Sequence, residues 1–334
     1  MKTIRDVARC AGVSPATVSR VLNDKGYVSE EKKKKIEKVI TEMGFEPNQV
    51  ARGLAKKTSN TLALIVSDIT NPFFPELAKG AEQVALSNGY TLMLGNTKGA
   101  DNKPNDYTKI LMNKYIDGII IATHDIDSQL LKKYSNMPMA ILEMENDVEN
   151  ACTIKVENVH GSVLATEHLI SQGCKKIAHI YGPLYDQTSK ERLQGYQKVI
   201  SMHSDYEEVT IQSDFTIDGG INAVDQLLHK YPDIDGLFVG NDLMAVGVIK
   251  ELNRLSIRVP DEIAVCGFDG IYLTRIVNPE ITTIEQPIYK MGEIAAEKLI
   301  DRINNPHLNR ECIVLDVKLR VRQSSKKSKQ NTIF

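Results

Sequence analysis

Apolar residues recur at helical spacing through the first 45 residues of the chain. A first short helix is predicted between Thr3, its N-cap, and Gly12. A second is predicted to begin at Ser14 and Pro15, an N-cap followed by proline at the first helical position, and a third covers residues 30–43. The apolar faces are Ile4, Val7, Ala8, Ala11, Val18, Val21, Leu22, Ile36, Val39, Ile40 and Met43. Two short helices joined by a glycine-containing turn predict a helix-turn-helix, whose second helix fits the DNA major groove.

From Thr61 onward the pattern changes to short apolar runs that alternate with amphipathic helices, which is typical of parallel βαβ units. The predicted strands fall into two groups, 62–66, 91–94, 118–122, 139–142 and 153–156, then 176–180, 209–212, 237–239, 263–267 and 282–284. The fold class is therefore α/β, with an all-α headpiece followed by two similar lobes, each a doubly wound parallel sheet. Ligands bind at the carboxyl ends of such strands, so a cleft between the lobes is the expected site.

Charge is spread unevenly along the chain. The net charge is −2, but residues 1–60 hold 13 Lys and Arg against 7 Asp and Glu, which leaves +6 there and −8 on the remainder. A basic segment on an acidic body suits a polyanionic partner such as nucleic acid. A solvated charged helix would give the same balance, because residues 32–35 alone supply four positive charges.

Several function classes lack their sequence signals. No apolar run approaches the ~18 residues that a membrane span needs, and the N-terminus does not resemble a signal peptide, so a cytoplasmic protein is expected. The five scattered cysteines predict reduced thiols, and the seven histidines show no metal-ligand spacing. The chain has no GxGxxG after the first strand, no P-loop, no GxSxG and no HExxH. No metal, cofactor or enzymatic activity is expected.

The solvent face of the second helix carries side chains that suit DNA. Arg20 can donate two hydrogen bonds to guanine, although a solvent-exposed arginine would look the same in isolation. Thr17 and Ser19 suit phosphate oxygens, and Ser14 lies where a helix N-terminus meets phosphate. Pro15 and Ala16 offer only apolar contact.

The headpiece resembles that of the lactose/galactose-repressor family in residues 3–8, 12–14 and 17–23. Residues 44–54 resemble that family's hinge helix, which orders on operator DNA and pairs across the minor groove, with Leu54 in the place of the intercalating leucine. The resemblance implies that the chain binds double-stranded operator DNA as a homodimer. The residues expected to contact DNA are Thr3, Ser14, Pro15, Ala16, Thr17, Ser19, Arg20, Asn23, Asn48, Ala51 and Leu54.

Polar and aromatic residues follow the predicted strands of the body. Aromatic faces cover sugar C–H surfaces, while Asp, Asn and Arg pair with hydroxyls; the alternatives are a core role for the aromatics and a turn cap for Asp269. The layout also resembles periplasmic sugar-binding proteins and the effector domains of sugar repressors, the ribose-repressor branch above all. The residues expected to line an effector site are Asn71, Phe73, Phe74, Glu143, Arg192, Phe215, Asn241, Asp269 and Gln286. Arg192 is expected to open a helix.

The resemblance divides the chain into parts. They are a headpiece (1–46), a hinge helix and linker (47–58), an N-terminal lobe (59–158 with 288–318), a C-terminal lobe (159–287 with 319–323) and a disordered tail (324–334). The chain is expected to cross between the lobes near Asn158, Pro287 and Leu319. No leucine-heptad extension is present, so a dimer is expected and a tetramer is not.

One departure bears on the effector. Ribose binders place an Asp-Arg pair after the fourth strand, whereas this chain has Glu143 and Met144, and methionine donates no hydrogen bond. Ribose is therefore doubted, and another pentose, a hexose or a sugar phosphate is equally open.

The alternative functions are a catabolite-control-type regulator gated by a protein co-repressor and a sugar-binding protein without a DNA role. The sequence predicts a sugar-gated, DNA-binding regulator, and the resemblance implies that it represses carbohydrate-use genes.

Overall fold

The computed structural model describes residues 2–22, 26–45, 58–97, 116–124, 126, 128–144 and 148–326. The chain divides into two compact units, Met1–Asn60 and Thr61–Phe334. Four of the predicted DNA contacts, together with nearly all of the predicted hinge helix, lie outside the described residues. These four are Asn23, Asn48, Ala51 and Leu54.

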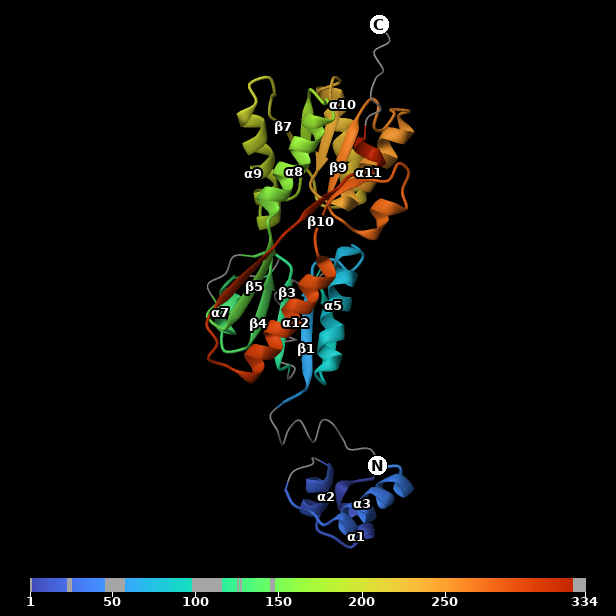
Figure 1. Cartoon of the computed structure of the whole chain (residues 1–334), viewed down its shortest axis with the longest axis vertical. Helices are drawn as coiled ribbons and strands as arrows, with labels where there is room; N and C mark the ends of the chain where they lie inside the picture. The colour runs from blue at the N-terminus through green and yellow to red at the C-terminus, as the bar shows by residue number, and fades with distance from the viewer. Residues whose placement is uncertain are drawn as a thin grey trace. The chain divides into compact units, whose positions relative to one another are not determined.

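Three helices form the first unit: α1 (Ile4–Ala11), α2 (Pro15–Leu22) and α3 (Glu30–Met43) (Figure 1). Thr3 caps α1 through reciprocal hydrogen bonds with Asp6, and the Ser14 hydroxyl accepts the Thr17 backbone N–H at the start of α2. The apolar faces meet in one small core made of Val7, Ala8, Ala11, Val18, Ile36 and Phe45. The predicted helix-turn-helix with a supporting third helix is confirmed.

The second unit contains two sheets, each forming the centre of a lobe (Figure 1). The first sheet has the order β11-β5-β4-β3-β1-β2, and each neighbouring pair in it is parallel. Its strands are β1 (Thr61–Val66), β2 (Thr91–Asn96), β3 (Gly118–Ala122), β4 (Met139–Leu142), β5 (Ala151–Val156) and β11 (Glu311–Leu315). Described helices of this lobe are α5 (Phe73–Ser87), α7 (Ser128–Lys133) and α12 (Ile288–Asn304).

The second sheet repeats this plan with the order β12-β10-β9-β8-β6-β7. Its strands are β6 (Ile177–Tyr181), β7 (Val209–Gln212), β8 (Gly236–Val239), β9 (Ala264–Asp269), β10 (Thr282–Glu285) and β12 (Lys318–Arg320). Its helices are α8 (Asn158–Ser171), α9 (Gln187–Met202), α10 (Ile217–Lys230), α11 (Asp242–Arg254) and the short η1 (Tyr272–Arg275) and η2 (Gln323–Ser325). Only β12 among these described strands pairs antiparallel, with β10. The predicted α/β class with two parallel-sheet lobes is confirmed.

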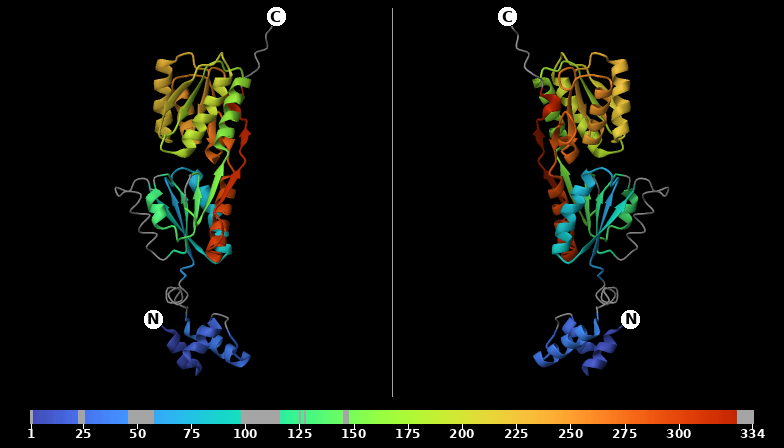
Figure 2. Two further views of the ribbon diagram at one scale, coloured as in Figure 1. Left: turned by 90° about the vertical axis from the view of Figure 1, so that its left-hand side faces the viewer. Right: turned by 90° about the vertical axis from the view of Figure 1, so that its right-hand side faces the viewer.

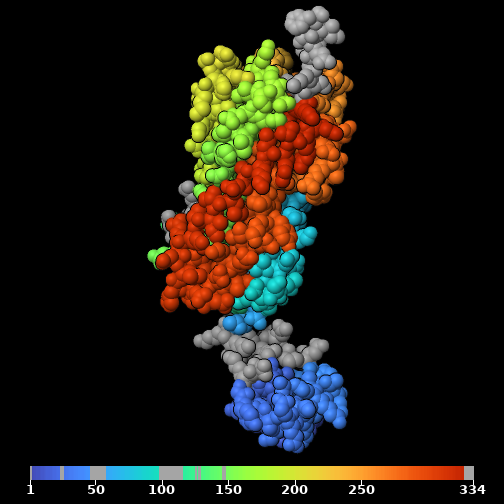
Figure 3. All heavy atoms as spheres, viewed as in Figure 1, coloured from blue at the N-terminus to red at the C-terminus, as the bar shows by residue number. Residues whose placement is uncertain are grey.

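The chain passes between the sheets at three places among the described elements: between β5 and α8, between β10 and α12, and between β11 and β12. Figure 2 shows the segment from β11 to β12, in dark red, along one side of both lobes, and Figure 3 shows it at the surface. The third crossing, predicted near Leu319, lies between Leu315 and Lys318. Leu319 already pairs with Ile284 in the second sheet, whereas Leu315 still pairs with Val156 in the first.

The segment at Ser324 also differs from the sequence prediction, which began a disordered tail there. Ser324 and Ser325 are fully buried in η2. The Ser324 hydroxyl donates to the Val265 carbonyl at 2.6 Å, and that of Ser325 bonds to Thr282 and His168, both at 2.7 Å. A run of polar residues predicts disorder only when its hydroxyls have no buried partners, and here the second lobe supplies them.

Helices α5 and α12 of the first lobe pack closely enough to require glycine at their contact. A Cβ atom at Gly80 would lie 2.1 Å from the Tyr289 carbonyl oxygen, and one at Gly292 would lie 2.0 Å from that of Leu77. The two helices therefore approach backbone to backbone through reciprocal glycines. Because α12 follows directly after a crossing, this contact fixes where the second crossing enters the first lobe.

Replacing either glycine by alanine should destabilise the protein. At an unhindered helix position, glycine to alanine stabilises by about 1 kcal/mol, but here the added methyl would overlap a carbonyl oxygen. We expect Gly80→Ala and Gly292→Ala each to lower the free energy of unfolding by ~1–3 kcal/mol in urea titrations followed by circular dichroism. Ser87→Ala, at an exposed position of α5, is the control and should change it little. A stabilised Gly80→Ala variant would show that the helices are not in close contact.

Candidate functional site

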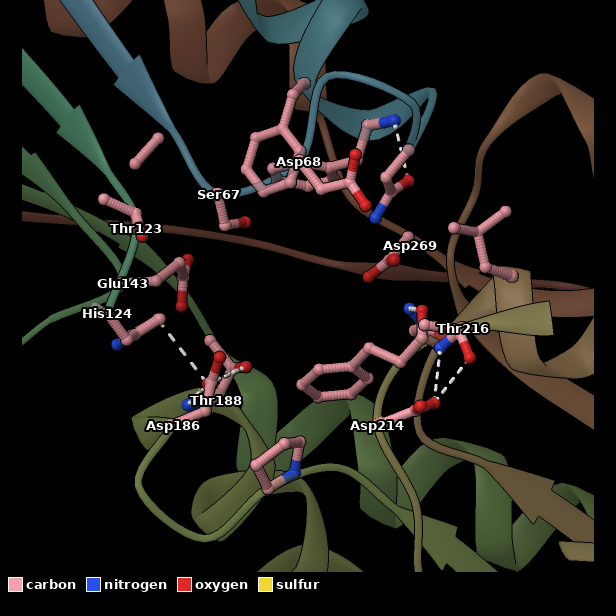
Figure 4. Close-up of a pocket in the computed structure, with 18 of the residues that line it drawn as sticks. Ser67, Asp68, Thr123, His124, Glu143, Asp186, Thr188, Asp214, Thr216 and Asp269 are labelled. Atoms are coloured by element: carbon pink, nitrogen blue, oxygen red, sulfur yellow. Dashed lines mark hydrogen bonds and ion pairs between the residues drawn. The ribbon is translucent and has the colours of Figure 1, made fainter. Parts of the chain in front are cut away.

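A cavity of about 620 Å³ lies between the two lobes of the second unit, at the carboxyl ends of the strands. We call it the interlobe cavity. Figure 4 shows side chains from both lobes pointing into it, among them Asp68, Thr123 and Glu143 from the first lobe and Asp186, Asp214 and Asp269 from the second. It is lined by every residue that the sequence predicted for an effector site: Asn71, Phe73, Phe74, Glu143, Arg192, Phe215, Asn241, Asp269 and Gln286.

Arg192 is buried at the centre of the polar side chains. Its Nε donates to Asn158 Oδ1 at 3.0 Å, and its Nη1 donates to the Gly240 carbonyl at 2.6 Å and lies 3.1 Å from Asp269 Oδ1. The guanidinium also stacks on Phe268, 3.8 Å from the ring centroid. The prediction that Arg192 opens a helix is wrong, because Asp186 caps α9 and the helix begins at Gln187.

Asp269 and Gln286 connect this arginine to the second crossing. Gln286 Nε2 donates to Asp269 Oδ1 at 2.8 Å, and the backbone N–H of Gln286 donates to the Asp269 carbonyl at 3.0 Å. Burial raises the pKa of Asp269 to about 6, although the nearby Arg192 favours its charged form. Gln286 Oε1 is buried and has no hydrogen-bond partner among the described residues, so it remains an acceptor for a bound molecule.

Glu143 brings a carboxyl of the first lobe to the same network. Its Oε1 accepts the Val156 backbone N–H at 2.8 Å, and its Oε2 accepts from Asn158 Nδ2 at 2.7 Å. Burial raises the pKa of Glu143 to about 7, and the hydrogen bond from Asn158 and the charge of Arg192 limit the rise. Asn158, at the first crossing, thus bonds to Glu143 through its amide nitrogen and to Arg192 through its oxygen. Sequence analysis placed Asn158 at the crossing but not at the site.

Three phenylalanine rings line the interlobe cavity among the described residues, together with Tyr185. Phe73 and Phe74 from the start of α5 pack edge to face with centroids 5.2 Å apart. Phe215, from the loop after β7, has a left-handed backbone (φ +63°) and its ring covers Gly182, where a Cβ atom would come within 2.1 Å of it. Rings from both lobes can therefore cover the apolar faces of a ligand.

The two asparagines of the predicted set are partly occupied. Asn241 caps α11 by accepting the Met244 backbone N–H at 2.9 Å, and its Nδ2 donates to the Phe215 carbonyl at 3.3 Å. Asn71 Oδ1 accepts the Phe73 backbone N–H at 3.1 Å. Both side chains thus position a neighbouring phenylalanine as well as lining the cavity.

Three acidic turns at the cavity were not among the residues predicted to line the effector site. Asp68, Asp186 and Asp214 each accept from the backbone N–H and the hydroxyl of a threonine two residues later. The repeated Asp-x-Thr spacing just after strands β1, β6 and β7 is the signal that could have found them. His124 of the first lobe faces one of them, with its Nε2 3.5 Å from Asp186 Oδ1.

The first unit presents a separate candidate surface for nucleic acid. On α2 the residues Ser14, Pro15, Ala16 and Arg20 are exposed, Thr17 and Ser19 are half-buried, and Val18 is buried in the helical core. Thr3 is exposed while it caps α1. The predicted contact residues that the structure describes on α2 thus share the face turned away from the core.

Comparison with known proteins places both units. Residues 3–48 match the family described as bacterial regulatory proteins, lacI family, and residues 166–325 match a periplasmic binding protein-like domain. The chain is 40% identical to a ribose operon repressor of Halalkalibacterium halodurans, with 98% of each chain covered. It is 34% identical to the transcriptional repressor PurR of Photobacterium profundum, covering 98% of this chain and 99% of that one.

The chain belongs to the lacI family of bacterial regulatory proteins. It is a DNA-binding transcription regulator, as the helix-turn-helix predicted. A solved structure of a lacI-family transcriptional regulator from Enterococcus faecium with bound ribose matches with a TM-score of 0.73 and 27% identity, covering 80% of this chain and all of that one. Among the described residues of this lacI-family regulator, the helices are too short or too polar to cross a membrane.

Removing the Glu143 charge should change how the stability of this lacI-family regulator depends on pH. The pKa of Glu143 is higher in the folded chain, about 7, than the ordinary value of 4.5 that it takes on unfolding. The stabilisation from the protonated form is therefore complete below about 4.5 and lost as the pH rises through 7. We expect Glu143→Gln to gain ~1–3 kcal/mol in unfolding free energy relative to the natural chain between pH 5 and 8.

Urea unfolding at several pH values measures this difference, and the exposed Glu149→Gln is the matched control with no such gain. Parallel pH profiles for the natural chain and Glu143→Gln would contradict the raised pKa.

Proposed function

We propose that the chain is an operator-binding transcriptional repressor whose affinity for DNA is set by a neutral monosaccharide in the interlobe cavity. The observation that carries this proposal is the excess of hydrogen-bond acceptors among the lining side chains. The carboxyl groups are those of Asp68, Glu143, Asp186, Asp214, Asp218 and Asp269. Arg192 is the one lysine or arginine among the described lining residues, and Asp269 already pairs with it.

An acceptor-rich cavity favours a ligand with many donors. Each sugar hydroxyl can donate to a carboxylate or to the unpartnered Gln286 Oε1, while the rings of Phe73 and Phe215 can cover its C–H faces. A purine has few donors to offer to so many oxygens. A sugar phosphate would bring about two negative charges next to several carboxylates, with one arginine to offset them.

Ribose is the first sugar to test, because two similar proteins carry ribose in their names or structures. A ribose operon repressor and a ribose-bound regulator are both similar to this chain. The sequence argument against ribose rested on Met144, which supplies no donor. Met144 packs beside the apolar cluster under β3 and β4 and is not among the residues that line the interlobe cavity. Of Glu143 and Met144, it is Glu143 that lines the cavity, and its carboxyl oxygens can accept hydrogen bonds from a ligand.

The remaining parts of the proposal concern how the helical headpiece binds DNA. Two copies would read a near-palindromic operator, with α2 of each copy in the major groove and the hinge segments between them, and the regulator would act in the cytoplasm and without catalysis. Exposed Arg20 would contact a base edge. The dimer, the hinge contacts and the wedge at Leu54 remain predictions, as does repression of carbohydrate-use genes.

A ligand screen on the whole chain tests the effector. We expect D-ribose or another neutral monosaccharide at ~100 times its dissociation constant to add roughly 2.7 kcal/mol of stability in thermal unfolding. Ribose 5-phosphate, other sugar phosphates and free purines should give no shift. Asp269→Ala should remove the sugar response, and Glu149→Gln, at an exposed position, should keep it. A shift with a phosphate or a purine alone would refute the neutral-sugar assignment, and no shift at all would favour a protein co-repressor.

Base readout by the headpiece is tested separately. Operator sequences selected from random duplexes would define the preferred site of the natural chain, and fluorescence anisotropy would compare variants. We expect Arg20→Ala to lose ~1–3 kcal/mol of discrimination at one position in each half-site. Lys38→Ala removes an exposed charge of α3 and should weaken binding equally for all sequences. Unchanged base preference in Arg20→Ala would exclude this arginine from the readout.

A further inference from the structure

Asp242, the first residue of α11, is a fully buried carboxyl that does not line the interlobe cavity. Its Oδ2 accepts the backbone N–H groups of Gly270 and Ile271 at 2.6 and 3.0 Å. Its Oδ1 accepts from the Thr283 hydroxyl of β10 at 2.6 Å. One side chain of α11 therefore fixes the turn after β9 and connects it to the neighbouring strand.

The turn that Asp242 holds has an unusual backbone. Asp269 has φ +119° and Gly270 has φ +83°. Glycine adopts such values readily, but a residue with a Cβ atom is strained there by an amount of order 1–3 kcal/mol. Asp269 keeps this conformation only if surrounding contacts hold it. The two N–H groups immediately after it, both bound to Asp242, are such contacts.

The strained conformation allows Asp269 to make three polar contacts with two residues, Arg192 and Gln286. Its carboxylate lies 3.1 Å from Arg192 and accepts from Gln286 Nε2, and its carbonyl accepts the Gln286 backbone N–H. Gln286 is at the second crossing between the lobes. Asp269 can therefore line the interlobe cavity and hold a crossing at the same time, which a relaxed turn would not allow.

A glycine on β9, Gly267, leaves space for the carboxyl group of Asp242. A Cβ atom at Gly267 would lie 2.3 Å from Asp242 Oδ1. Any larger residue at this position would displace the carboxyl from the turn. Gly267 is an observation independent of the hydrogen bonds, and it points to the same role for Asp242.

We propose that Asp242 is the positioning residue of the interlobe cavity, which holds Asp269 in its left-handed conformation so that Asp269 faces the ligand, Arg192 and the second crossing together. The proposal deepens the proposed function and rests on it for the ligand. Asp242 itself touches no ligand. Its effect on ligand binding passes through the turn.

Two substitutions of Asp242 separate the hydrogen bonds from the charge. Asp242→Asn keeps one oxygen for the two backbone N–H groups, and its amide can donate to the Thr283 hydroxyl, which can then donate to the Ile284 carbonyl. Asp242→Ala removes all three bonds. Thr283→Val removes only the donor to Oδ1 and serves if Asp242→Ala does not fold. Glu251→Gln, at another buried carboxyl of α11, is the matched control.

Amide hydrogen exchange of the whole chain, without ligand, gives the first readout. We expect exchange at Gly270 and Ile271 to rise about tenfold or more in Asp242→Ala, less in Thr283→Val, and to stay near the natural rate in Asp242→Asn and Glu251→Gln. Natural exchange rates at these amides in both Asp242→Ala and Thr283→Val would overturn the proposal. Raised exchange spread over the whole lobe in Asp242→Ala, with none in Thr283→Val, would also overturn it, because Asp242 would then support the fold in general.

The second readout uses D-ribose and the neutral monosaccharides of the screen as probes. For any sugar that stabilises the natural chain, we expect Asp242→Ala to weaken the apparent affinity for that sugar at least about tenfold. Asp242→Asn should keep most of the natural affinity. An Asp242→Ala variant with a disturbed turn and the natural sugar response would overturn the positioning role. If no monosaccharide stabilises the natural chain, the proposed function fails, while the exchange rates still decide whether Asp242 holds the turn.

Discussion

Burial of one guanidinium organises the interlobe cavity. Removing the charge of Arg192 from water is costly, and the structure offsets this with an ion pair to Asp269, hydrogen bonds to Asn158 and to the Gly240 carbonyl, and the face of Phe268. These partners come from the start of α8, the end of β9 and the residue after β8. The arginine thus fixes the ends of β8 and β9 and the start of α8 relative to one another.

The same network reaches both crossings that lie at the cavity. At the first crossing, Asn158 also donates a hydrogen bond to Glu143 of the first lobe. At the second crossing, Asp269 accepts a hydrogen bond from Gln286. A molecule bound among these side chains would contact residues that also form hydrogen bonds at the two crossings. Allosteric coupling of ~1–3 kcal/mol, typical of such switches, needs only a few altered hydrogen bonds at these positions.

The sequence was sufficient for the lobes and for most of the cavity because both depend on local patterns. Apolar strands were recognisable from composition, and side chains just past their carboxyl ends meet at one edge of a parallel sheet, so Phe73, Asn241 and Asp269 could be grouped without coordinates. Strands β11 and β12 were missed because they carry exposed residues and a weak alternation. Pairing with β5 and β10, far away in sequence, decides their conformation.

Positioning residues were harder to predict than lining residues. Asn158 was predicted only as a crossing and Asp242 was not singled out, because the partners that give them a role are distant in sequence: Arg192 for the first, and Gly270 with Thr283 for the second. Ser324 and Ser325 were read as a tail for the same reason. A polar residue has no visible signal of burial until the fold brings a partner to it.

The acidic lining of the interlobe cavity and the buried arginine are two parts of one arrangement. The charge of Arg192 lowers the pKa of Glu143 and of Asp269. Burial outweighs this effect and raises the two pKa values to about 7 and about 6. One positive charge cannot fully compensate the surrounding carboxyls, and a carboxylate oxygen can accept more than one hydrogen bond. The proposed polyhydroxylated ligand would supply donors to carboxyls of both lobes without adding charge. A charged ligand would either repel the carboxyls or displace Arg192 from the partners that hold it.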